Sequence, residues 1–228
     1  MTVTSKPGTQ LLTIGIVTQA MFVVIAILVL SKITQSFDTG LAQAINNTPP
    51  GGAISTLMIL ATNYGREYFW TLVVMIMLLF GDRNTKLFAV ELAALFIVGI
   101  VSGEVLKILL PRQRPYETLS GIGLLVPSES DSSFPSGHAL IVAIGAAFSL
   151  ARFKSRILGL GLTVEAAIVC YSRVYVGVHY PLDVAAGVLF GVSIVGIGLL
   201  LIEQYLGKIL KTLTSTAVKI LREGPLSL

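Results

Sequence analysis

Residues 11–30 form an unbroken run of 20 residues without a charged side chain. As an α-helix rising about 1.5 Å per residue, this run would reach roughly 30 Å, the thickness of the hydrocarbon core of a bilayer. Only 12% of the chain is charged and 54% is hydrophobic, whereas about a quarter of a typical soluble domain is charged. Only Lys6 precedes the run and no small-residue cleavage site closes it, so we expect a retained membrane helix rather than a signal peptide.

Five further apolar runs follow along the chain. Alternating segments of about ten residues, which are typical of membrane barrels, are absent from the sequence. We therefore predict an all-α integral membrane protein, a single domain over residues 1–228, with six transmembrane helices in one bundle. The predicted spans are residues 11–30, 66–81, 87–110, 137–152, 157–178 and 181–202.

The last 25 residues differ from these spans because apolar and basic residues alternate with helical spacing. Leu206, Ile209, Leu210 and Leu213 would share one face, with lysines on the others. This pattern predicts an amphipathic helix over residues 203–223 lying on the anionic cytoplasmic leaflet. A disordered basic tail is the alternative.

The distribution of cations predicts the orientation. With six spans, both termini and the loops near residues 81–86 and 152–156 share one side, which carries ten lysines and arginines against six on the other. Because cytoplasmic loops are enriched in Lys and Arg, we expect a multi-pass plasma-membrane protein with cytoplasmic termini. Cys170 is the only cysteine, so no internal disulfide is expected.

Polar residues gather at span ends on the predicted outer side, although charged groups near a bilayer centre cost about 2.5–3.5 kcal/mol each. Ser136 would cap a helix, and Gly137 would let its backbone N–H groups approach an anion. Permanent cations nearby would complete a phosphate site. The residues of this predicted phosphate site are Lys107, Arg114, Ser136, Gly137 and Arg173.

The only two histidines, His138 and His179, lie at the same predicted face. Asp183 follows His179 by four residues, one helical turn, so its carboxylate could accept one ring proton and leave the other nitrogen as a nucleophile. For any one of these polar residues taken by itself, the alternative to a catalytic role is that it anchors its helix at the membrane interface. A metal site of two imidazoles and a carboxylate is a second alternative, but nearby cations would repel a divalent ion. We expect no metal and no cofactor.

Three segments, KILLPRQRP, PSGH and SRVYVGVHYPLD, resemble in order and spacing the three signature motifs of the type-2 phosphatidic acid phosphatase superfamily. The resemblance implies a six-helix membrane core with its active site at the outer membrane interface. It also implies that His179 attacks phosphorus and forms a phosphohistidine, that Asp183 orients His179, and that His138 protonates the leaving oxygen and then activates water.

The resemblance further implies a metal-independent phosphatase acting on a lipid phosphomonoester or pyrophosphate, with a polyprenyl pyrophosphate favoured. Phosphatidylglycerophosphate or phosphatidic acid is the next choice, followed by a lipid phosphotransferase or a non-catalytic transporter on the same fold. The vanadate-dependent haloperoxidases share the motifs but are soluble, which the hydrophobic content argues against. We expect the bilayer and a membrane lipid phosphate as partners and no nucleic acid; no oligomeric state is predicted.

Three carboxylates within the predicted spans, Glu91, Glu104 and Glu165, have no place in the motifs. Structural pairing is the expected role of each, with Glu104 holding Lys107 three residues on. A functional role is the alternative, because intramembrane carboxylates are commonly functional. The loop over residues 111–135 contains four prolines and the polar run SESDSS, which is typical of a functional lid or binding loop.

Overall fold

The computed structural model describes residues 7–47 and 51–223, with side chains for residues 8–47 and 51–205, and these residues form helices and no strand. The helices in chain order are α1 (Pro7–Leu30), α2 (Gln35–Asn46), α3 (Gly52–Tyr64), α4 (Glu67–Phe80), α5 (Arg83–Leu109), α6 (Pro115–Thr118), α7 (Gly137–Arg152), α8 (Arg156–Tyr175) and α9 (Pro181–Glu223).

The predicted spans fall on α1, α4, α5, α7, α8 and α9. Among the described residues, four helices are long and apolar enough to cross a membrane: α1, α5, α8 and the Pro181–Tyr205 part of α9. The other two, α4 and α7, are shorter apolar helices. The all-helical membrane class is therefore confirmed, whereas a count of six crossings stays a prediction.

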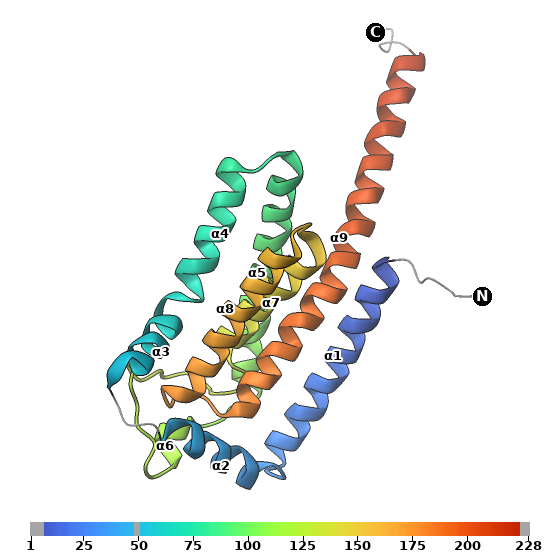
Figure 1. Cartoon of the computed structure of the whole chain (residues 1–228). Coiled ribbons are helices and arrows are strands. Elements are labelled where there is room, and N and C mark those ends of the chain that lie inside the picture. Colours follow the sequence, from blue (N-terminus) through green and yellow to red (C-terminus); the bar gives the residue numbers. More distant parts are fainter. Residues whose placement is uncertain (1–6, 48–50, 224–228) are drawn as a thin grey trace, which may run out of the picture.

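The long helices run side by side, and their connections gather at two ends (Figure 1). The start of α1, the α4–α5 and α7–α8 connections and the far part of α9 lie at one end. The short helices α2 and α6 lie at the opposite end, together with the segment that joins α5 to α7. This second end carries the polar residues described below.

Helix α7 packs against α5, α8 and α9. Glycines on α5 and α9 let these two helices approach α7 closely. A Cβ on Gly187 or Gly191 of α9 would lie 2.5 Å from a backbone oxygen of Ser136 or Leu140, respectively. A Cβ on Gly99 of α5 would lie 2.5 Å from the Ile144 side chain. Such distances leave no room for a methyl group, so α7 is held in a fixed position relative to α5 and α9.

The C-terminal segment differs from the prediction of a separate helix. Residues 203–223 continue α9 without a break from Pro181 to Glu223. Residues 203–223 are therefore helical, as predicted, but they belong to α9 and do not form a helix of their own. The predicted amphipathic face begins at Leu206, beyond the described side chains, and stays a prediction.

Two of the three intramembrane carboxylates have the expected ion-pair partners. Glu91 Oε2 lies 3.1 Å from Arg152 Nε, and Glu104 Oε1 lies 3.6 Å from Lys107 Nζ. Among the described residues, Glu165 forms no ion pair and both of its carboxylate oxygens are buried. The pairing expected for Glu165 is therefore not observed there and stays a prediction.

Candidate active site

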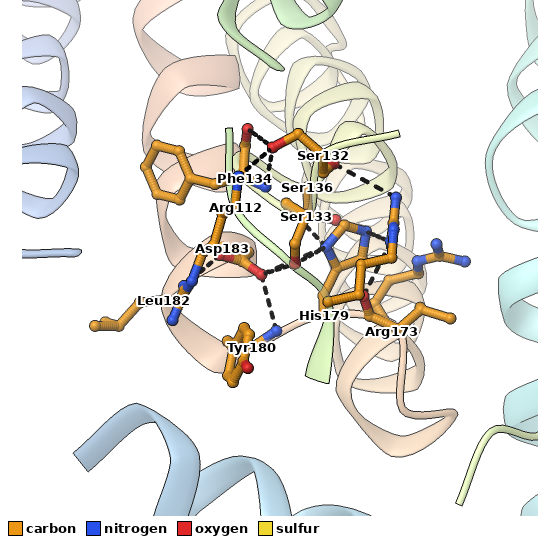
Figure 2. A network of polar contacts seen from close by, with 12 residues as sticks. Arg112, Ser132, Ser133, Phe134, Ser136, Arg173, His179, Tyr180, Leu182 and Asp183 are labelled. Atoms are coloured by element: carbon orange, nitrogen blue, oxygen red, sulfur yellow. Dashed lines mark hydrogen bonds and ion pairs between the residues drawn. The ribbon is translucent and has the colours of Figure 1, made fainter. Parts of the chain in front are cut away.

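The predicted site residues converge although they are distant in sequence. They come from the end of α5, the 111–135 segment, the start of α7, the end of α8 and the start of α9. Figure 2 shows part of this network, with the Ser133 side chain lying between the Asp183 carboxylate and the His179 ring.

The N-terminus of α7 forms one wall of the site. Ser136 Oγ accepts a hydrogen bond from the Ala139 N–H at 3.4 Å, as expected of an N-cap. The Ser136 N–H donates to the Asp183 backbone carbonyl at 3.0 Å, which joins α7 to α9. A Cβ on Gly137 would lie 3.7 Å from Lys107 Nζ and 3.4 Å from Arg66 Nη1. Two cations therefore flank this helix terminus, which itself favours anions.

The three predicted phosphate-binding cations share two carboxylates from the 111–135 segment. Lys107 pairs with Asp131, and Arg173 pairs with Glu129. Arg114 Nη2 pairs with both, at 2.5 Å from Asp131 Oδ1 and 2.7 Å from Glu129 Oε2. Arg114 is 0% exposed and Arg173 is 2% exposed. The sequence predicted the cations, but not these two carboxylates.

The cations keep the two loop carboxylates ionised. Burial acts to raise the pKa of Asp131, but hydrogen bonds and charge from Lys107 and Arg114 outweigh it and lower that pKa to about 2. Burial likewise opposes ionisation of Glu129, and the nearby positive charges, that of Arg173 first, hold its pKa below the ordinary value. A site that stabilises carboxylates this strongly also favours other anions.

The ring of His179 is buried and held at both nitrogens. Its Nδ1 donates to the backbone carbonyl of Ser133 at 2.8 Å, while Asp183 Oδ2 lies farther away at 3.6 Å. Nε2 lies 3.3 Å from Arg114 Nη1. With the proton on Nδ1, the lone pair of Nε2 faces the cations. The expected acceptor for the ring proton was Asp183, but the closer acceptor is a main-chain oxygen.

Asp183 instead accepts hydrogen bonds from other groups. Its Oδ2 accepts from the Ser133 hydroxyl and, at 2.9 Å, from the Tyr180 N–H. Its Oδ1 pairs with Arg112 Nη1 at 2.5 Å. Arg112 also pairs with Asp38 of α2 at 2.7 Å. Asp38 in turn accepts from the Leu182 N–H at 2.9 Å. This chain of contacts fixes the start of α9, which begins two residues after His179.

The surroundings of His179 favour its neutral form. Burial, followed by the positive charges of Arg173 and Arg114, holds the pKa of His179 well below its ordinary value of 6.5. A neutral imidazole has a lone pair at neutral pH, which a nucleophile requires.

The second histidine, His138, lies in the first turn of α7 and faces a cation outside the motifs. Its Nδ1 lies 3.4 Å from Arg66 Nη1. The structure thus brings together all eight predicted residues and adds others that the sequence reasoning missed. The added residues are Asp38, Arg66, Arg112, Glu129, Asp131 and Ser133. Three of them, Glu129, Asp131 and Ser133, belong to the polar run SESDSS, which had marked the long loop as a candidate binding loop.

Buried cations surround an imidazole whose Nε2 lone pair faces the Arg114 guanidinium, and together they form a candidate anion-binding site at one end of an all-helical membrane protein. Within the described part of the chain, no three His, Cys, Asp or Glu residues are placed to share a metal ion. The sequence model of the PAP2 superfamily matches residues 86–206. The chain belongs to the PAP2 superfamily.

Comparison with individual proteins agrees with this membership. The chain is 44% identical over 138 residues to an undecaprenyl-diphosphatase of Sulfolobus acidocaldarius, covering 60% of this chain and 66% of that relative. The match therefore spans slightly less than two thirds of that relative. The structure of Aquifex aeolicus LpxE is similar with a TM-score of 0.63 and 26% identity, covering 72% of this chain and 94% of LpxE.

A second solved structure shows the same fold. It is the transmembrane PAP2 type phosphatidylglycerolphosphate phosphatase from Bacillus subtilis. The TM-score is 0.67 and the identity is 22%, over 83% of this chain and 96% of that protein. Together with the apolar helices, this likeness identifies a multi-pass membrane protein.

Proposed function

We propose that the chain is a metal-independent lipid phosphatase that hydrolyses a polyprenyl diphosphate through a phosphohistidine on His179. The observation that carries the proposal is the state of the His179 ring. Nδ1 is bound by the Ser133 carbonyl, and Nε2 lies 3.3 Å from the buried Arg114 guanidinium. A lone pair aimed at a cation cluster is suited to attack a phosphoryl group whose oxygens those cations bind.

The proposed reaction has two steps. His179 Nε2 attacks phosphorus while Lys107, Arg114 and Arg173 bind the phosphoryl oxygens. The bond from phosphorus to the leaving oxygen breaks, and His138 donates a proton to that oxygen. In the second step His138 removes a proton from water, which attacks the phosphohistidine and releases inorganic phosphate. Ser136 and the Gly137 N–H contribute hydrogen bonds to the phosphoryl oxygens.

The choice of substrate rests on the likeness to the undecaprenyl-diphosphatase at 44% identity. We place the site at the extracytoplasmic face and the termini in the cytoplasm, with six crossings. In support, the site lies at the end opposite the start of α1 and the α4–α5 and α7–α8 connections (Figure 1). Lys154 lies in the α7–α8 connection, and Arg83, Lys86 and Arg156 lie in the first turns of α5 and α8 at the same end. Cytoplasmic segments next to membrane spans are enriched in such residues.

The test is phosphate release by the purified full chain in detergent with EDTA, on undecaprenyl diphosphate, phosphatidic acid and phosphatidylglycerophosphate. Turnover that survives EDTA and vanishes in His179→Ala supports the proposal, and the three rates identify the substrate. Arg156→Gln is the matched control, because Arg156 is exposed and is the first residue of α8, whose start lies at the end of the bundle opposite α2 and α6 (Figure 1). Failure of the wild type on all three lipids overturns the proposal.

A further inference from the structure

Arg66 belongs to none of the three motifs, yet its position in the site is fixed by the packing of its neighbour. It lies in the two-residue break between α3, which ends at Tyr64, and α4, which begins at Glu67. A Cβ on Gly65 would lie 2.3 Å from the Val169 side chain of α8. This close approach holds the break against α8, and from this break the Arg66 side chain reaches His138 at the start of α7.

The Arg66 guanidinium lies on the His138 side of the site. Its Nη1 is 3.4 Å from His138 Nδ1 and 3.4 Å from the position of a Cβ on Gly137. Arg114, in contrast, contacts His179. Arg114 is thus the cation in contact with His179 and Arg66 is the cation in contact with His138, while Lys107 lies near Gly137 as Arg66 does.

This separation matters because phosphoryl transfer proceeds with the attacking and leaving groups roughly in line. The leaving oxygen must lie within reach of the acid, His138, on the side away from His179. When the substrate is a lipid diphosphate, the leaving group is a lipid monophosphate, which carries negative charge. When the substrate is a lipid monophosphate, the leaving group is released as a neutral alcohol. A cation beside His138 therefore gains an additional anionic partner when the leaving group is itself a phosphate.

We infer that Arg66 binds the phosphate group that departs with the lipid, which makes it a specificity-determining residue for diphosphates over monophosphates. The inference rests on the proposed function and deepens it. A guanidinium can bind two oxygens of one phosphate, and such charge-assisted hydrogen bonds are stronger than neutral ones.

An apolar groove begins at this arginine. Its volume is about 260 Å³, and it runs between α4 and α5 from Arg66 to side chains that include Trp70, Phe96, Ile97 and Ile100. A phosphate bound at Arg66 would have its hydrocarbon chain beside this groove. The groove therefore accommodates the first isoprene units of the departing lipid. Arg66 and the apolar side chains line the same groove, so one lipid molecule can contact both.

The existing partner of Arg66 does not prevent this binding. Arg66 Nη2 pairs with Glu67, whose side chain is 56% exposed. Exposed ion pairs contribute little stability, because water competes for both groups. Arg66 itself is 28% exposed at the side chain, so a substrate phosphate can reach it and exchange with the glutamate.

The test compares Arg66→Gln with the wild type on undecaprenyl diphosphate and undecaprenyl monophosphate. We expect the ratio of kcat/KM for the diphosphate to that for the monophosphate to fall at least tenfold. Arg66→Lys should restore part of the ratio, and Arg156→Gln should leave it at the wild-type value. An equal loss on both lipids, or no loss, overturns the inference.

A binding measurement separates this inference from the proposed function, because it needs no turnover. Calorimetry on His179→Ala would give the affinities for inorganic pyrophosphate and inorganic phosphate, with and without Arg66→Gln. We expect the added substitution to weaken pyrophosphate binding about tenfold and phosphate binding less than threefold. Equal effects on the two anions overturn the role of Arg66 even if the wild type is an active phosphatase. Absence of lipid hydrolysis by the wild type overturns the proposed function instead.

Discussion

The carboxylate of Glu129 pairs with the buried guanidinium of Arg114, with 2.7 Å between Oε2 and Nη2. Its second oxygen pairs with Arg173. A substrate phosphate needs the same N–H groups, so it must compete with Glu129 for them. The polar run in the long loop is therefore part of the site's electrostatics, and the loop sets how tightly an anion can bind.

Replacement of Glu129 by glutamine should tighten anion binding. An amide competes less well than a carboxylate for two arginines, so we expect the inhibition constant for inorganic phosphate to fall roughly three- to tenfold. The measurement is product inhibition of phosphate release. Glu203→Gln, which removes a carboxylate that pairs with Arg152 away from the site, is the control. Weaker phosphate inhibition in Glu129→Gln would mean that Glu129 positions the arginines instead of competing with substrate.

The contact between His179 and the Ser133 carbonyl leads to a second prediction. Asp183→Asn removes a charge but not the main-chain acceptor of the Nδ1 proton. We therefore expect kcat to fall about 10- to 100-fold, less than the roughly 10⁴-fold seen where a carboxylate alone fixes the tautomer. Ser133→Ala, which keeps the carbonyl, should cost less than tenfold. If Asp183→Asn were as inactive as His179→Ala, the carboxylate would be the group that holds the tautomer.

The pH dependence provides a third prediction. Burial and the charges of Arg173 and Arg114 hold the pKa of His179 well below 6.5. The ring is neutral above its pKa, so His179, the proposed nucleophile, keeps its Nε2 lone pair at neutral pH and loses it only in acid well below pH 6.5. Because the unfolded chain takes up this proton near pH 6.5 and the folded chain does not, protein stability falls as the pH drops below that value.

The histidine content makes this pKa directly measurable. The chain has two histidines, so His138→Gln leaves His179 as the sole imidazole in a protein purified without a histidine tag. An NMR titration of that ring should give a midpoint well below 6.5. A midpoint at 6.5 or above would contradict the electrostatic account of the site.

The positions of the motif residues on the helices could be predicted from the sequence, because helix ends and fixed spacings determine them. Ser136 as N-cap, Lys107 in the last turn of α5 and Asp183 one turn after His179 all follow from local periodicity. The path of the 111–135 loop does not, since it depends on contacts between distant residues. Glu129, Asp131 and Ser133 therefore remained unassigned, as did Arg66, whose place depends on the α3–α4 break packing against α8.

Helix packing around α7 provides the last prediction, because it determines where the acid His138 lies. A Cβ on Gly145 would lie 2.3 Å from the buried Trp70 ring, and overpacking of this kind typically costs about 1–3 kcal/mol. Gly161 in α8 has no atom within 4 Å of its Cβ position. Ala should stabilise the helix there by up to about 1 kcal/mol. Gly145→Ala should thus lower the Tm in detergent, and Gly161→Ala should hold or raise it.

The pair of substitutions also separates stability from positioning. Gly145 and His138 lie on the same helix, so a displacement of α7 by the Trp70 clash should lower kcat at temperatures where Gly145→Ala remains folded. Gly161→Ala should keep wild-type kcat, since α8 near Gly161 is far along the chain from Arg173. A wild-type Tm and kcat in Gly145→Ala would show that Trp70 turns aside without moving α7, and the site would then tolerate more freedom in this helix than its glycine contacts indicate.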